Sequence, residues 1–208
     1  MKQRLIAILV GGILSLGLAS VSAAARDDSD QSRDDTYRSH NDTYRSHDDT
    51  YSPDEITQSV SDFFGMTTEA SAKAVERVFS DLGEPDGYIK GGEGSGAFIA
   101  GVRYGSGFLV RKGFEPVKVY WKGPSVGFDF GGNASKCFTL VYNLREERRL
   151  YQRFPGVEGS FYFIAGLGVN YMRSGGVTLA PMRTGVGLRA GVNMHYQVYS
   201  DRRDWFPL

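Results

Sequence analysis

The sequence GPSVG at residues 123–127 matches the G-x-S-x-G pattern around the nucleophile of a serine hydrolase. Such a serine needs a strand-to-helix turn, with a histidine and an acid that approach it in space. The next residues, FDFGG at 128–132, do not begin a helix, and His195 is the single histidine after residue 51. Because short motifs often match by chance, we do not expect Ser125 to be a catalytic nucleophile.

The glycine-rich sequence GGEGSG at residues 91–96 has the composition of a phosphate-binding loop. It lacks the G-x-G-x-x-G spacing, the P-loop lysine and a following helix whose N-terminus would hold the anion. We therefore predict a flexible turn between strands. Three carboxylates, Glu93, Asp129 and Glu158, could meet in space for glycoside hydrolysis, but nothing in their spacing favours a catalytic pair.

Metal and thiol chemistry have few candidates in this chain. Residues 52–208 hold one cysteine and one histidine, which make no cluster of metal ligands and no disulfide within the chain. We predict that Cys137 is a small buried apolar residue. The sequence therefore predicts no catalytic residue, no metal and no cofactor, in a protein that is not an enzyme.

The N-terminal residues have the order of a secretory signal peptide. Lys2 and Arg4 precede an uncharged apolar run over residues 5–18, and small residues follow it. A membrane anchor, the alternative, needs about 20 apolar residues, and a lipoprotein would need a cysteine near the cut. We predict that residues 1–25 are a signal peptide cleaved near Ala23–Ala25, and that the mature protein is periplasmic.

Residues 26–51 differ in composition from the rest of the chain. They hold eight aspartates, four arginines and no Leu, Ile, Val, Phe or Trp, and a seven-residue unit with one tyrosine recurs from residue 35. One tyrosine per unit gives no apolar seam for a coiled coil, and too little apolar surface to offset the entropy of ordering. We predict a disordered acidic spacer in which His40 and His47 are solvated rather than bound to metal.

Charge excludes one class of partner. The chain has 24 basic and 24 acidic residues, and residues 52–208 have 18 and 16. A nearly neutral domain lacks the basic surface with which a protein binds nucleic acid. About 155 residues suit a single domain with a hydrophobic core, and no later segment is long and apolar enough to form a membrane-spanning helix.

Local signals predict two helices over residues 52–83. Ser-Pro-Asp-Glu at 52–55 has the pattern of a capping box with proline at the first helical position, and Gly65 should end this helix. A second helix should begin at Thr67 or Thr68 and end at Gly83. Its apolar residues recur at helical spacing: Ala74, Val75, Val78, Phe79 and Leu82.

From Gly87 onwards, glycines alternate with aromatic and β-branched residues, which predicts short strands. In VKVYWK at 117–122 the lysines share a face with the tyrosine, and the valines share the other face with the tryptophan. One short helix is predicted near 145–153. The fold class is mainly β: a small closed antiparallel β-barrel of about 8–10 strands over 87–200, behind two N-terminal helices. The predicted strands lie near 88–90, 97–105, 107–112, 116–121, 126–130, 136–142, 160–173, 177–180 and 185–199.

The sequence VYWKGPSVGFD at 119–129 resembles the EipA (envelope integrity protein A) family, an alphaproteobacterial domain family of unknown function. The resemblance covers roughly residues 55–200 and implies a soluble periplasmic protein with a small β-barrel that helps to maintain the cell envelope. It implies no catalytic residues. A weaker similarity, through Trp121–Pro124, is to SYLF lipid-binding domains. Further matching segments are GGNASK at 131–136, RFPGVEG at 153–159, GLGVNY at 166–171, LAP at 179–181 and RTGVGLR at 183–189.

We therefore expect non-catalytic binding of an envelope component, which could be a protein, a lipid or a glycan. The alternative is a carrier with a lipid or apolar ligand inside the barrel, although side chains usually fill small barrels. An outer-membrane barrel is disfavoured because the strands at 107–112 and 177–180 are shorter than the ~9–11 residues needed to cross a membrane. Six residues are candidates for ligand binding, with Trp121 as an apolar wall: Trp121, Asp129, Asn133, Lys136, Asn170 and Arg183. The alternative roles are turn formation for Asp129 and Asn133, and a surface charge or a structural ion pair for Lys136 and Arg183.

Overall fold

The computed structural model describes four stretches of the chain, which all belong to one compact unit: residues 49–95, 102–124, 135–184 and 196–204. Several features predicted from the sequence lie outside these residues: the signal peptide over 1–25, the spacer up to residue 48, Ser125, His195, and the strand positions 97–101, 126–130 and 185–195.

Two helices precede the sheet, α1 over Pro53–Phe64 and α2 over Thr68–Leu82. The capping box predicted for Ser52 and Glu55 is present, and Gly65 ends α1 in the left-handed conformation. Both helices are confirmed. Neither of these described helices is both long enough and apolar enough to cross a membrane.

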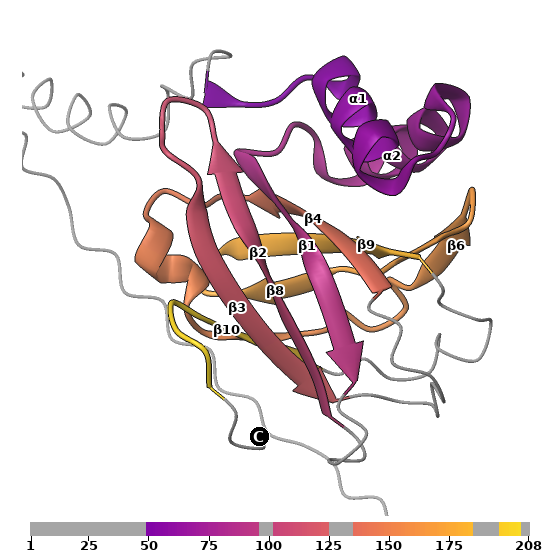
Figure 1. Cartoon of the computed structure of the whole chain (residues 1–208). Helices are drawn as coiled ribbons and strands as arrows, with labels where there is room; N and C mark the ends of the chain where they lie inside the picture. Colours follow the sequence, from indigo (N-terminus) through magenta and orange to yellow (C-terminus); the bar gives the residue numbers. More distant parts are fainter. Residues whose placement is uncertain (1–48, 96–101, 125–134, 185–195, 205–208) are drawn as a thin grey trace, which may run out of the picture. The chain divides into compact units, whose positions relative to one another are not determined.

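The strands form one antiparallel sheet that curves into a half-barrel (Figure 1). Its order is β5-β10-β3-β2-β1-β4-β9-β7-β6, and β8 also pairs with β9. The strands are β1 (Gly87–Ser95), β2 (Val102–Arg111), β3 (Val117–Pro124), β4 (Ser135–Tyr142), β5 (Arg153–Pro155), β6 (Tyr162–Ile164), β7 (Leu167–Val169), β8 (Met172–Ser174), β9 (Val177–Arg183) and β10 (Tyr196–Ser200).

The prediction of a mainly β fold with two helices is confirmed, but the predicted closed barrel is only approximately right. In the described part of the chain, the edge strands β5 and β6 do not pair with each other. β5 approaches β8 through a single bridge between Gly156 and Met172, beside a backbone hydrogen bond of 2.8 Å from Val157 to Tyr171. Strands of three residues supply too few hydrogen bonds to make this a continuous ladder, so the sheet is not closed.

The glycine-rich sequence at 91–96 is not the flexible turn that we predicted, because its first five residues continue β1. Gly91 lies opposite Gly107 of β2. A Cβ added to Gly91 would lie 2.2 Å from the carbonyl oxygen of Ser106. The close approach of the two strands therefore requires glycine at this position, and the glycine marks a packed strand rather than a loop.

Two other predicted elements have different boundaries. The described part of the strands predicted at 97–105 and 107–112 is one strand, β2, whose pairing with β1 is unbroken. The helix predicted near 145–153 is a single 3₁₀ turn, η2, over Glu147–Leu150. The last residue of η2 is fully buried, and Arg153 already begins β5, so the chain leaves the helical conformation after one turn.

The strand predicted over 160–173 is three short strands instead. β6 and β7 are joined by Ala165 and Gly166, which have φ values of 51° and 86°. Gly175 and Gly176 join β8 to β9 in the same way, at 55° and 82°. Two successive positive φ values are what a type I′ hairpin turn requires. No local signal in the sequence indicates the turn at Ala165, since alanine rarely adopts the left-handed conformation.

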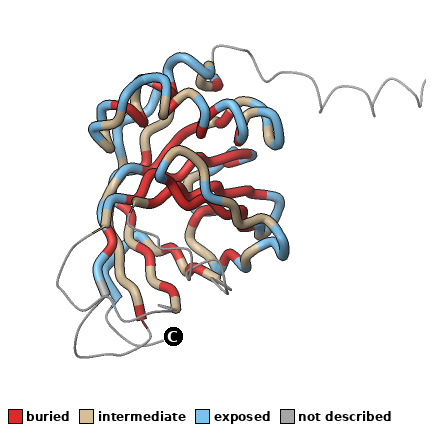
Figure 2. The backbone as a smooth tube through the Cα atoms, turned by 90° about the vertical axis from the view of Figure 1, so that its right-hand side faces the viewer, coloured by how far each residue is buried: buried red, intermediate tan, exposed pale blue. Residues whose placement is uncertain are grey.

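Hydrophobic side chains form one core between the helices and the outer face of the sheet. Val60 of α1 and Val78 of α2 are fully buried against Phe138 and Met182, on β4 and β9. Figure 2 shows buried residues running along the strands, while exposed residues lie on the surfaces of the helices. The apolar stripe predicted for α2 is thus the face that covers the sheet.

A second core fills the inner side of the half-barrel. Val119 and Trp121 of β3 are buried in it, whereas Lys118 is exposed, so the predicted alternation of this strand is confirmed. The residues of this core are Ile89, Leu109, Val119, Trp121, Cys137, Val141, Leu144, Leu150, Phe154, Met172, Val177, Leu179 and Tyr199.

The turn between β6 and β7 provides a test of this fold. We expect Ala165→Asn to raise the free energy of unfolding by about 1 kcal/mol, because asparagine tolerates the left-handed conformation better than alanine. Gly166→Ala should lower it by a similar amount, about 1 kcal/mol. Urea unfolding followed by circular dichroism measures both. An Ala165→Asn protein less stable than the wild type would contradict the turn.

Candidate functional site

A carboxylate is buried on the inner side of the sheet. Glu93 follows Ile89 and Gly91 on the inward face of β1, and 1% of its surface is exposed. Its neighbours across the sheet are Gly105 of β2 and Ser135 of β4. A buried charge is costly unless it is paired and hydrogen-bonded, so the surroundings of this side chain determine what it can do.

Trp121 reaches Glu93 across a glycine. In the register of the sheet, Gly105 lies between Glu93 and Trp121, and a Cβ on Gly105 would lie 2.1 Å from the indole ring. The absent side chain lets the indole lie over β2 and donate its Nε1 hydrogen to Oε1 of Glu93 at 2.9 Å. We predicted Trp121 as an apolar wall, and the structure adds that its polar atom binds a charge.

Arg183 pairs with Glu93 from β9. Its Nε donates to both carboxylate oxygens, at 3.1 Å and 3.0 Å, and 2% of Arg183 is exposed. Its Nη1 donates to Oδ1 of Asn170 at 2.9 Å, which orients the guanidinium. The Nη2 of Arg183 is buried and has no hydrogen-bond partner among the described residues.

Two further donors complete the shell around the carboxylate. Nη1 of Arg103 donates to Oε2 of Glu93 at 3.1 Å, and Nε2 of Gln197 donates to Oε1 at 3.3 Å. The hydroxyl of Tyr199 donates to Oε1 of Gln197 at 3.2 Å. Side chains of β2, β3, β9 and β10 therefore meet on one residue of β1. We call this set (Glu93, Arg103, Trp121, Asn170, Arg183, Gln197 and Tyr199) the buried network.

The electrostatics of the buried network favour the charged form of Glu93. Burial by itself would raise the pKa of Glu93, but the charge of Arg183, the charge of Arg103 and the hydrogen bonds from Arg183 and Trp121 outweigh it. The pKa of Glu93 falls from 4.5 to about 2. The pKa of Arg183 is raised, because its attraction to Glu93 outweighs the burial that lowers it. Both groups are thus charged at neutral pH.

These properties do not suit acid–base or thiol catalysis. A general acid or base works best with a pKa near the working pH, and Glu93 is an ionised, fully hydrogen-bonded carboxylate. Burial, followed by the nearby charge of Glu93, raises the pKa of the Cys137 thiol to about 12. Cys137 is 1% exposed, as predicted for a small buried residue. In the described stretches, no three His, Cys, Asp or Glu side chains gather as metal ligands.

The predicted site residues fall into three groups. Trp121, Asn170 and Arg183 are brought together in the buried network. Lys136 lies elsewhere, where its Nζ donates to the carbonyl oxygen of Phe63 at 2.7 Å and holds the end of α1. The other two, Asp129 and Asn133, lie outside the described residues. Of the carboxylates considered for glycoside chemistry, Glu158 is exposed, whereas Glu93 is buried.

The sequence did not single out Glu93 as the centre, nor Arg103 and Gln197 as its partners. One signal was available, because Glu93 is the only charged residue in a run of glycines. It is also four residues from Ile89, an even separation that places two residues on the same face of a strand. Had that run been recognised as a strand, Glu93 would have fallen on the buried face. Its partners could not be found in this way, since Arg183 is 90 residues away.

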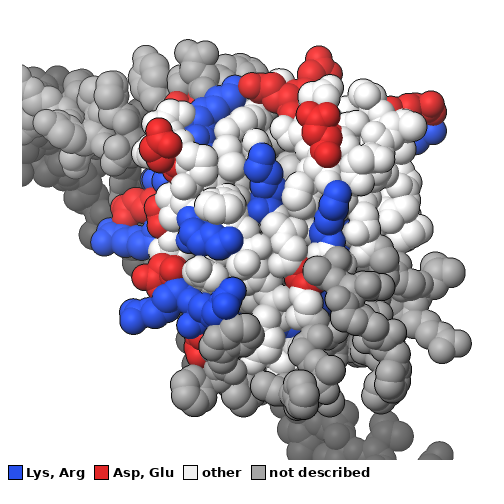
Figure 3. All heavy atoms as spheres, in the orientation of Figure 1, with Lys and Arg blue, Asp and Glu red and all other residues white. Residues whose placement is uncertain are grey.

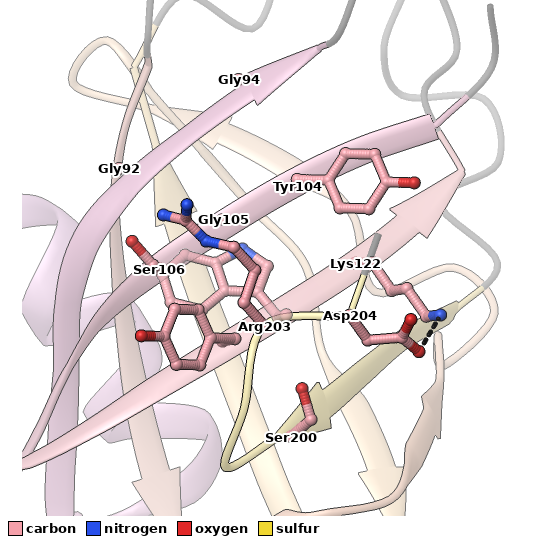
Figure 4. A pocket seen from close by; sticks show the side chains of 11 residues that line it. Gly92, Gly94, Tyr104, Gly105, Ser106, Lys122, Ser200, Arg203 and Asp204 are labelled. Atoms are coloured by element: carbon pink, nitrogen blue, oxygen red, sulfur yellow. Dashed lines mark hydrogen bonds and ion pairs between the residues drawn. The ribbon is translucent and has the colours of Figure 1, made fainter. Parts of the chain in front are cut away.

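A groove of about 330 Å³ lies on the opposite, outer face of β1, β2 and β3 (Figure 4). Gly92 and Gly94 line it from β1, and Tyr104 lines it from β2. Lys122 of β3 is joined to Asp204, in the chain after β10, by an ion pair of 2.8 Å. Gly105 and Trp121 also line it, so the groove borders the buried network, and it is a concavity that a ligand could enter from the outer face. A second hollow, of about 630 Å³, is lined by residues of α2, β8 and β9.

The fold and the buried network define an antiparallel, half-barrel β protein whose interior charges are paired. The Envelope integrity protein A family model matches residues 49–208, so the chain belongs to this family, as the resemblance implied. This membership indicates an envelope-related role.

A solved structure is also similar to the chain. It is the crystal structure of a beta-barrel-like, uncharacterised protein from Brucella abortus, with 47% sequence identity and a TM-score of 0.71. The match covers 77% of this chain and 99% of that chain. Among curated proteins, none matches the chain.

Breaking the buried network should destabilise the fold. We expect Glu93→Gln to lower the free energy of unfolding by about 3–5 kcal/mol, because Arg183 is left buried without its counter-charge. The double variant Glu93→Gln/Arg183→Met should lose less than the sum of the two single variants. Denaturant unfolding measures each value. Glu158→Gln, which changes an exposed carboxylate, is the control and should stay within about 0.5 kcal/mol of the wild type.

The lowered pKa of Glu93 also predicts a pH dependence. The stability that comes from its ionised form is fully present above pH 4.5 and is lost as the pH falls towards 2. We expect this carboxylate to contribute about 3 kcal/mol to the fall of wild-type stability over that interval. Urea unfolding between pH 2 and 5 should show the loss in wild type and Glu158→Gln, and a smaller loss in Glu93→Gln. Equal slopes in all three proteins would contradict the ion pairing.

Proposed function

We propose that the mature chain is a soluble periplasmic protein that supports envelope integrity by binding an envelope component without catalysis. Export is supported by the signal-peptide pattern over residues 1–25, which we infer is cleaved near Ala23–Ala25. The envelope-related role is supported by membership of the Envelope integrity protein A family.

One observation carries the non-catalytic part of this proposal: the buried carboxylate of Glu93 is paired with Arg183 and hydrogen-bonded on both oxygens. Glu93 accepts hydrogen bonds from Arg183, Arg103, Trp121 and Gln197. A carboxylate bound in this way has its lone pairs occupied and stays ionised, so it stabilises the fold rather than exchanging protons with a substrate. The groove on the outer face is a feature that non-catalytic binding could use.

A lipid or apolar-ligand carrier, as the similarity to SYLF domains suggests, is our second candidate. Such a carrier needs an apolar cavity for its ligand. The inward side chains of the described strands, such as Leu109, Val119 and Leu179, are instead buried against one another in a shared core. This packing favours binding at the surface over binding inside the half-barrel.

Complementation of a deletion strain tests the proposed function. Cells that lack the gene should become sensitive to detergent and to antibiotics that act on the cell wall, and the wild-type gene should restore resistance. Ser125→Ala should restore it equally well, because we propose that this serine performs no chemistry. A deletion strain with full resistance would contradict the envelope role. A Ser125→Ala gene that does not restore resistance, although its protein accumulates, would contradict the non-catalytic role.

A further inference from the structure

We infer that the groove on the outer face of β1, β2 and β3 binds an acidic sugar unit of an envelope glycan. The inference rests on the proposed function, since an exported protein meets such glycans in the envelope, and it names the class of ligand. It follows from the glycines, the tyrosines and the charges that line the groove.

Two glycines keep the groove open, although the packing around them does not require glycine at either position. Among the described residues, a Cβ on Gly94 would meet no atom within 4 Å, and a Cβ on Gly92 would meet only the carbonyl oxygen of Ser135, at an ordinary 3.8 Å. Gly91 on the same strand is different, because its neighbours leave no room for a side chain. Glycine weakens a strand because it has no side chain to pack. At Gly92 and Gly94 the missing side chains leave the backbone exposed, so a flat ligand can approach it.

Two tyrosines offer ring faces beside this bare surface. In the register of β2 and β3, Tyr104 is opposite Lys122 and Tyr120 is opposite Ser106, so both rings lie on the outer face as diagonal neighbours. A sugar ring has C–H groups on its faces and hydroxyl groups around its edge. The face of a tyrosine packs against the C–H groups while its hydroxyl can exchange hydrogen bonds with the edge, which makes this pair suited to a saccharide.

The basic residues on this face favour an acidic sugar over a neutral one. In the described parts of β1, β2 and β3, the outward positions carry Lys90, Lys118 and Lys122 and no acid, since Glu93 points inward. Figure 3 shows Lys and Arg side chains spread over the middle of this face. The groove itself is lined by Lys122 and Arg203 and by one acid, Asp204, which pairs with Lys122, so a carboxylate on the ligand would meet a net positive charge.

Arg203 is placed to bind such a carboxylate. It lies in the chain after β10, and its guanidinium is 5.9 Å from the ring centroid of Tyr120. In Figure 4 its side chain extends back over the strands, near Ser106, while Lys122 and Asp204 form their ion pair at another side of the groove. Arginine binds planar carboxylates through two parallel hydrogen bonds, so the groove combines ring stacking with recognition of an acid.

Titration of the purified mature protein with defined saccharides tests this inference. The probes are the disaccharide of N-acetylglucosamine and N-acetylmuramic acid, digalacturonic acid, and neutral diacetylchitobiose, followed by calorimetry and saturation-transfer NMR. We expect saturable binding of at least one acidic probe, weakened by added salt, and binding of the neutral probe at least ~10-fold weaker. The two acidic probes distinguish a lactyl carboxylate from one carried on the sugar ring.

Matched variants assign the binding to the groove. Tyr120→Ala should raise the dissociation constant about 10-fold by removing a ring face, while Tyr120→Phe, which keeps the ring, should change it less than about 3-fold. Gly94→Leu should abolish binding, because its side chain fills open space and leaves the core untouched. Phe163→Ser is the control: this residue of β6 is 51% exposed and outside the groove, so affinity should be unchanged.

Several results would overturn the inference: no saturable binding of either acidic probe, equal affinity for the neutral probe, or binding that survives Gly94→Leu. Co-sedimentation with phosphatidylglycerol vesicles in place of sugar binding would also overturn it, in favour of a lipid surface. If the wild-type gene still restores envelope resistance after such a result, the proposed function stands and the ligand class fails. Loss of resistance in the Gly94→Leu strain, with normal accumulation of the protein, would support both the proposed envelope function and the groove as its binding site.

Discussion

Glu93 carries a negative charge into the inner side of the half-barrel, and the side chains around that charge come from four other strands. Removing an ion from water costs several kcal/mol unless partners compensate, so the strands must meet in a register that delivers those partners. Arg183 on β9 and Gln197 on β10 are distant in the strand order, yet both bind the same carboxylate. The buried network thus connects strands across the interior of the half-barrel, although backbone hydrogen bonds do not close the sheet.

Glycine has opposite roles on the two faces of this sheet. On the inner face, Gly105 is required because the indole of Trp121 occupies the space of a side chain. On the outer face, Gly92 and Gly94 are not required by packing, and they leave a shallow groove beside tyrosines and cations. The polar groups of the inner face are thus hydrogen-bonded to one another, whereas the glycines of the outer face leave backbone exposed beside polar side chains.

The local elements could be predicted because their signals are contained within a few residues. The box formed by Ser52 and Glu55 satisfies backbone groups of α1 by itself, and Gly65 ends that helix at no steric cost. The alternation along β3 separates its two faces for the same reason. The turn at Ala165 and the strand through Gly91 were missed, since an alanine with positive φ and a packed glycine have no distinctive local pattern.

The sequence by itself determined the two helices, the mainly β class and the family, and it determined which face of β3 is buried. It also selected Trp121, Asn170 and Arg183 as polar or aromatic residues in glycine-rich surroundings. Only the tertiary structure decided that these three meet on Glu93, that Lys136 instead holds the end of α1, and that the sheet stays open. The physical reason is distance along the chain: a helix cap needs a partner three residues away, whereas the ion pair joins residues 90 apart and exists only once the strands are in register.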